Sequence, residues 1–202
     1  MNKIKPTDVE IHDLLQRRWS PRAFDGRPIE PDRLRRIFEA ARWAPSCYNE
    51  QPWRFVVGQK EAGEEYQKLF GLLAAGNQAW CSTAAVLVLV CARKTFSHND
   101  KDNGWHLYDA GQAAAHLTVQ AMAEGIFVHQ MAGFDAAGAS EMFQLSEIFC
   151  PVTMIALGYP GDVGQLPENL RSAELAPGSR RPAREVVFEG EWEKTASFVE
   201  NV

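Results

Sequence analysis

The chain has 202 residues, of which 46% are hydrophobic and 23% are charged, and its formal net charge is −5. This length and composition predict one globular domain with a substantial core. The negative net charge argues against a nucleic-acid-binding protein, which usually carries a net positive charge or a basic stripe.

The first half of the chain is predicted to alternate helices and strands. Thr7 and Glu10 have capping-box spacing, so we expect a first helix over 8–17. A second helix starts at Pro31, has apolar residues at i, i+3, i+4 and i+7, and stops at Pro45. The next predicted elements are a strand over 53–57, a helix over 61–73 and a continuously apolar, central strand over 84–91.

The second half is dominated by a long predicted helix over 105–124, which ends at Gly125. Its small residues could let another helix backbone approach closely, either within the chain or in a dimer. These small residues are Gly111, Ala114, Ala115 and Thr118. The remaining elements are a strand over 126–129, a helix over 136–146 and a strand over 152–157. Strands separated by helices without regular alternation predict an α+β fold with a mixed sheet.

From 160 to 202 the composition shifts toward proline, glycine and charge, and only 186–188 could form a strand. We therefore expect an extended C-terminal tail on a single domain that spans 1–202. The sequence shows neither a signal peptide nor an apolar run of about 18 residues, so a cytoplasmic protein without a membrane partner is expected. The four cysteines lack the close spacing of a zinc site or a redox dithiol, and no metal is predicted.

Basic residues concentrate near the N-terminus, where nine of the 14 arginines lie within the first 54 residues. Residues 17–24 read Arg-Arg-Trp-Ser-Pro-Arg-Ala-Phe. Three guanidinium groups and a hydroxyl could surround a phosphate, because arginine presents a planar fork of donors. The alternative is that these arginines are solvent-facing charges near a helix end.

A second motif follows at 44–55, Ala-Pro-Ser-Cys-Tyr-Asn-Glu-Gln-Pro-Trp-Arg-Phe. Ser46, Asn49 and Gln51 offer donors and acceptors, while Pro45 and Pro52 keep the loop out of a helix. This combination of groups suits a flat polar heterocycle.

The two motifs resemble the paired N-terminal signatures of the FMN-dependent nitroreductase-like family, Arg-x-Ser-x-Arg/Lys and Pro-Ser-x-x-Asn-x-Gln-Pro-Trp. Further similar segments lie at 109–112, 131–135, 158–162 and 180–182. The resemblance implies a nitroreductase-like α+β fold whose mixed, mainly antiparallel sheet is flanked by helices. It also implies an intertwined homodimer in which the 160–202 tail wraps over the partner subunit.

FMN is the cofactor that the resemblance implies. Arg18 and Ser20 match its phosphate and ribityl contacts, and Arg22 matches a basic residue near the pyrimidine edge. Arg180 is favoured over Arg181 to complete the phosphate site, because the family arginine stands two residues before a proline. The backbone N–H of Gly133 is assigned the catalytic position against flavin N5. The implied cofactor-binding residues are Arg18, Trp19, Ser20, Arg22, Pro45, Ser46, Cys47, Asn49, Gln130, Met131, Ala132, Gly133, Arg180 and Arg181.

The implied reaction is a ping-pong transfer of hydride from NAD(P)H through flavin N5 to a small organic acceptor, such as a nitroaromatic or a quinone. Tyr48, Phe96 and Trp105 are the candidate substrate contacts, and the polar segment 93–106 is a candidate lid. Ala132 stands where many relatives have glutamate. No Gly-x-Gly-x-x-Gly follows a strand, so nicotinamide is expected to stack transiently on the flavin.

Two alternatives stay open. A specialised enzyme of the same fold could be a dehydrogenase, a dehalogenase or a flavin-fragmenting enzyme. A non-enzymatic flavin-binding module is the other possibility.

Overall fold

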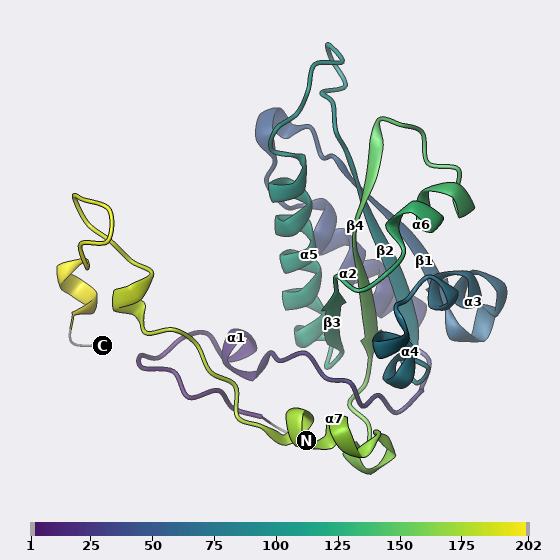
Figure 1. Ribbon diagram of the computed structural model, residues 1–202, viewed down its shortest axis with the longest axis horizontal. Coiled ribbons are helices and arrows are strands. Elements are labelled where there is room, and N and C mark those ends of the chain that lie inside the picture. The colour runs from purple at the N-terminus through teal and green to yellow at the C-terminus, as the bar shows by residue number, and fades with distance from the viewer. Residues whose placement is uncertain (1–2, 201–202) are drawn as a thin grey trace.

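The computed structural model describes residues 3–200, which form a central sheet with helices on both faces and a long C-terminal extension (Figure 1). The strands are β1 (Trp53–Gln59), β2 (Val86–Arg93), β3 (Phe127–Met131) and β4 (Phe149–Gly158). The α-helices are α1 (Asp13–Arg17), α2 (Pro31–Arg42), α3 (Glu64–Gly71), α4 (Ala75–Cys81), α5 (His106–Ala123), α6 (Ala136–Met142) and α7 (Glu168–Leu175).

The sheet has the strand order β1-β2-β4-β3, and every pairing between these four strands is antiparallel. Val88 in the middle of β2 pairs with Val57 of β1 and with Ile155 of β4. Because β2 lies between two strands and is covered on both faces, its residues form a continuous apolar run instead of an alternating pattern. The α+β fold and the central position of this strand are therefore confirmed, whereas the sheet is wholly antiparallel and not mixed as predicted.

Each face of the sheet has its own core. Val86, Val88 and Val90 point to the face covered by α2 and α5, while Leu87 and Leu89 point to the opposite face. Figure 1 shows α5 and α2 on one side and α3, α4 and α6 on the other. The result is a three-layer arrangement with α5 spanning the length of the sheet.

The first helix is shorter than predicted, since α1 begins at Asp13 and not at residue 8. Thr7 does not cap a helix; its hydroxyl accepts a 3.5 Å hydrogen bond from the side chain of Gln16. The backbone N–H of Lys5 also donates to the carbonyl of Gln16, so the chain bends before α1 and residues 5–7 lie beside the end of that helix. This long-range pairing overrides the local capping signal.

The tail contains a helix that was not predicted, α7, which a 3-10 turn at Val163–Gln165 separates from β4. Helix α4 was also missed, because its sequence Ala-Gly-Asn-Gln-Ala-Trp-Cys has weak helix propensity. The predicted strand over 186–188 is reduced to an isolated bridge between Phe188 and Thr195. Beyond α7 the tail extends away from the sheet (Figure 1) and exposes Trp192 and Phe198.

The small residues of α5 divide between two environments. Ala114 and Thr118 are buried within the chain, whereas Gly111 and Ala115 are exposed. Only half of the predicted small-residue side is therefore available to another helix.

Candidate functional site

A basic pocket of about 550 Å³ lies where the N-terminal segment, the turn after α1 and the start of the tail meet. Its charged lining consists of Lys3, Lys5, Arg18 and Arg180. The hydroxyl of Ser20 also faces it and accepts a 3.2 Å hydrogen bond from Arg18 Nη1. Residues from both ends of the described chain thus converge on one concave surface.

The charge in this pocket is not balanced, because no Asp or Glu is among the described residues that line it. Burial and the nearby Arg18 and Arg180 lower the pKa of Lys5 to about 8. Burial and the charge of Arg180 also lower the pKa of Arg18. A group that relieves this repulsion must be anionic and accept several hydrogen bonds, and a phosphate has both properties.

Trp19 lies between Arg18 and Ser20 in the first motif. Its ring packs edge-on against Phe127 at 6.2 Å, and the Lys3 ammonium lies 4.4 Å from the ring. The indole Nε1 is buried and has no hydrogen-bond partner within residues 3–200. An unused buried donor beside a basic pocket fits a site that is completed by an oxygen-rich ligand.

Sequence reasoning missed Lys3 and Lys5. Their alternating spacing places both side chains on one side of an extended segment, which is the signal that could have identified them. Of the two tail arginines, Arg180 lines both the basic pocket and a neighbouring groove, whereas Arg181 lines the groove and not the basic pocket. Arg22 lies outside the pocket and pairs with the buried carboxylate of Glu174 at 3.7 Å.

The second motif forms a strained turn. Tyr48, Asn49 and Gln51 all have φ between 51° and 56°, in the left-handed region that non-glycine residues seldom occupy. The Ser46 hydroxyl stabilises the turn by accepting a 3.0 Å hydrogen bond from the Gln51 N–H. The backbone N–H of Cys47 donates to Asp109 Oδ2 at 3.0 Å.

Asp109 is 2% exposed and sits in the first turn of α5. It therefore anchors the second motif to the N-terminal end of that helix, where a carboxylate is favoured by the helix dipole. Asp109 belongs to the family-like segment 109–112, but its position in the sequence does not reveal this role.

The segment between β2 and α5 forms a small hairpin that projects beyond the sheet (Figure 1). It is fixed internally by the Arg93–Asp100 ion pair at 3.0 Å. Glu50 of the second motif accepts hydrogen bonds from the N–H and the hydroxyl of Ser97. These contacts attach the candidate lid to the strained turn.

Two of the three candidate substrate residues come together. The Tyr48 ring meets Phe96 edge-on at 5.8 Å, and His98 lies beside both rings. Trp105 instead packs against Tyr108, with ring centroids 6.1 Å apart.

Gly133 follows β3 and approaches α4 closely. Its carbonyl accepts hydrogen bonds from the Ala74 N–H at 3.0 Å and from Asn77 Nδ2 at 2.9 Å. A Cβ at this position would lie 2.9 Å from Asn77 Nδ2, so a larger residue would displace the Asn77 side chain. The Gly133 N–H has no acceptor within the described chain, which leaves this donor free.

The other residues predicted around this turn have mixed environments. Met131 is buried and Ala132 is exposed. The amide of Gln130 donates to the Thr118 hydroxyl at 3.3 Å.

The two motifs lie at opposite ends of α5. Asp109 in the first turn holds Cys47, whereas Trp19 packs on Phe127, just after the helix ends. Helix α5 has 18 residues, and at 1.5 Å per residue it is about 27 Å long. One chain therefore does not bring the first and second motifs into a single site.

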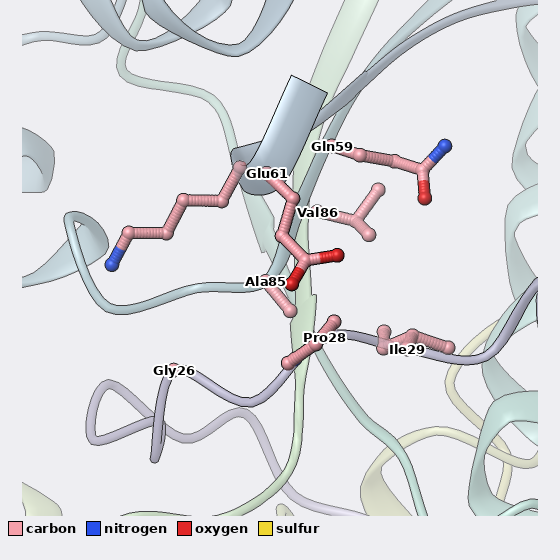
Figure 2. A pocket seen from close by; sticks show the side chains of 8 residues that line it. Gly26, Pro28, Ile29, Gln59, Glu61, Ala85 and Val86 are labelled. Carbon is pink, nitrogen blue, oxygen red and sulfur yellow. The ribbon is translucent and has the colours of Figure 1, made fainter. Parts of the chain in front are cut away.

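A separate pocket of about 280 Å³ lies between the loop before α2 and the edge of the sheet. Figure 2 shows apolar Pro28, Ile29 and Val86 on its walls and the side chains of Gln59 and Glu61 around it. It contains none of the predicted site residues.

Comparison with known proteins agrees with the motifs. Residues 15–80 match the nitroreductase family model. The structure is similar to that of an oxidoreductase containing FMN, with a TM-score of 0.89, 35% identity and coverage of 95% of this chain and 97% of that chain. A 15.4 kDa protein of Mycolicibacterium smegmatis is 32% identical over 146 aligned residues, and the match covers 69% of this chain and 97% of the relative.

More distant proteins share the fold. A nitroreductase family protein from Clostridium difficile 630 has a TM-score of 0.69 and 24% identity, covering 91% of this chain and 99% of that chain. A Streptomyces griseus protein, provisionally named NADH dehydrogenase/NAD(P)H nitroreductase, is 24% identical over 184 residues, covering 81% of this chain and 92% of the relative.

The fold and these similarities define an α+β oxidoreductase. The chain belongs to the nitroreductase family, which confirms the family expected from the sequence. No helix within residues 3–200 has the length and apolar character needed to cross a bilayer.

Proposed function

We propose that this protein is an FMN-dependent oxidoreductase that uses NAD(P)H as its electron donor. The observation that carries the proposal is the basic pocket, in which Lys5, Arg18 and Arg180 repel one another until an anion is present. The similar oxidoreductase contains FMN, whose terminal phosphate has the required charge.

Bound FMN supplies a ring that accepts hydride from NAD(P)H at N5 and passes electrons to an organic acceptor, such as a nitroaromatic or a quinone. Lys5, Arg18, Ser20 and Arg180 would hold its phosphate. The unpaired N–H of Gly133 is the donor available to the ring, and the glycine lets the backbone approach.

The second motif is proposed to act from a partner copy. Since the motifs lie at opposite ends of α5 within one chain, a compact site that uses both requires two chains. Exposed Gly111 and Ala115 on α5 would allow close contact, and the tail beyond α7 would wrap over the partner. We therefore propose a homodimer with two equivalent sites.

The Tyr48–Phe96 pair is proposed to contact the acceptor. Tyr48 is 85% exposed, and its ring is held by the strained turn at one end and by the hairpin at the other. Exposed, oriented aromatic faces favour planar aromatic acceptors over aliphatic ones.

The test is to compare the wild-type protein with Arg18→Ala/Arg180→Ala. Wild type should purify yellow with stoichiometric FMN and oxidise NAD(P)H when nitrofurazone is added. The double variant should lose the cofactor. Arg35→Ala/Arg184→Ala removes the same charge outside the pocket and should keep FMN. Retention of FMN by Arg18→Ala/Arg180→Ala would contradict the phosphate assignment.

Two further outcomes separate the alternatives. FMN that neither NADH nor NADPH reduces would indicate a flavin-binding module. Rapid reduction by nicotinamide without turnover of nitroaromatics or quinones would indicate a specialised reaction of the same fold.

A further inference from the structure

Glu174 is a buried carboxylate next to the basic pocket. It lies in the last turns of α7 and is 1% exposed. Burial of a charge is costly unless it is paired and hydrogen-bonded, so its partners indicate what it stabilises.

Those partners belong to the first motif. Glu174 Oε1 accepts hydrogen bonds from the backbone N–H groups of Arg22 at 2.9 Å and Ala23 at 3.2 Å. Glu174 Oε2 has no hydrogen bond within residues 3–200 and lies 3.7 Å from Arg22 Nη1. A single carboxylate thus holds the backbone of the turn and faces the guanidinium of the same residue.

The same helix also forms part of the pocket wall. Ala173 and Leu175, on either side of Glu174, line the basic pocket. Lys3 Nζ donates to the backbone carbonyls of Glu174 and Ala176, which fastens the N-terminal segment to the end of α7. Any displacement of Glu174 would therefore disturb both the turn and the pocket.

We propose that Glu174 is a positioning residue of the cofactor site, which fixes the Arg22–Ala23 turn and offsets the charge that Arg22 presents to the flavin. This inference rests on the proposed function. Positive charge near the pyrimidine edge stabilises the anionic reduced ring, so a carboxylate paired with Arg22 lowers the midpoint potential of the bound flavin.

The two parts of this role are separable by substitution. Glu174→Gln keeps an acceptor oxygen for the turn but removes the charge. It should keep FMN affinity within about threefold, since the backbone hydrogen bonds persist, and should shift the midpoint potential upward. Glu174→Ala removes the acceptor as well and should weaken FMN binding by about tenfold or more.

Two controls make the potential diagnostic. Glu168→Gln removes a carboxylate from the exposed face of the same helix, where it pairs with Arg171, and should leave the potential unchanged. In an Arg22→Met background, Glu174→Gln should no longer shift the potential, because a buried carboxylate that has lost its cationic partner takes up a proton and carries no charge for the substitution to remove. An unchanged potential in Glu174→Gln, or an equal shift in the Arg22→Met background, would overturn the proposal.

A readout without flavin distinguishes this inference from the proposed function. Amide hydrogen exchange of Arg22 and Ala23 in cofactor-free protein should be protected in wild type and Glu174→Gln and fast in Glu174→Ala. If wild type bound no FMN, the proposed function and the cofactor role of Glu174 would both fail. If wild type bound FMN but Glu174→Ala kept its amide protection, only the role of Glu174 would fail.

Discussion

At the scale of single residues, Lys5 is expected to make FMN binding depend on pH. Burial, together with the charges of Arg18 and Arg180, lowers its pKa to about 8 in the free protein. A bound phosphate favours the protonated ammonium, so affinity should decrease as the pH rises above 8. Titration of FMN fluorescence between pH 7 and 9.5 measures this decrease.

Lys5→Met should bind FMN more weakly at pH 7 and lose the decrease above pH 8, whereas Lys60→Met should behave as wild type. The stability of the free protein should change with pH in the opposite direction to its affinity for FMN. Because the unfolded chain retains the Lys5 proton up to a higher pH than the folded one, the free energy of unfolding of the free protein should rise with pH above 8. An unaltered pH profile in Lys5→Met would contradict the assignment.

The doubled arginine of the tail gives a second prediction at this scale. Arg180 lines the basic pocket and lowers the pKa of Arg18, whereas Arg181 faces the neighbouring groove. Arg180→Ala should weaken FMN binding by about tenfold or more, the usual effect of losing a charged hydrogen bond. Arg181→Ala should change it by less than about threefold. Equilibrium binding of FMN to the two variants distinguishes them, and equal losses would mean that both arginines bind the phosphate.

At the scale of elements, β1 and α3 are in contact through Gly58. A Cβ on Gly58 would lie 2.7 Å from the backbone of Tyr66, which cannot move without shifting the helix. Gly58→Ala should therefore destabilise the protein by about 1–3 kcal/mol through overpacking. Gly71→Ala, in the same helix with open space around it, should be neutral or stabilise by up to about 1 kcal/mol. Urea denaturation of both variants checks the difference.

The sequence predicted the elements whose signals are local or fully apolar. Helix α2 was predicted from Pro31 and its periodic apolar face, and β2 from its unbroken apolar run. The predictions were wrong where contacts between segments far apart in the sequence determine the local structure. Residues 8–12 are not helical, because the segment before them pairs with the end of α1, and Glu174 is buried because the first motif folds onto α7.

In the candidate site, too, residues with a local sequence signal were predicted, and residues brought together by long-range contacts were not. Motif spacing identified Arg18, Ser20 and Arg180, which the structure brings to one pocket. It did not identify Lys3, Lys5 or Asp109, whose roles depend on segments meeting in space. Nor could it show that Arg22 is paired with a buried carboxylate, because 152 residues separate the two.

At the scale of the whole molecule, the distance between the motifs makes a prediction about mixed dimers. One subunit would carry Arg18→Ala/Arg180→Ala and the other Ser46→Ala/Asn49→Ala. Each variant alone should bind no FMN tightly.

If every site combines the first motif of one chain with the second motif of the other, a mixed dimer has one site with all defects and one intact site. Co-expression with two different affinity tags should then yield a yellow heterodimer with about half the FMN of wild type, a stoichiometry set by two-fold symmetry. If each chain formed its own site, both sites of the heterodimer would be defective and the purified protein would be colourless. The absorbance ratio of flavin to protein after purification on both tags decides between these arrangements.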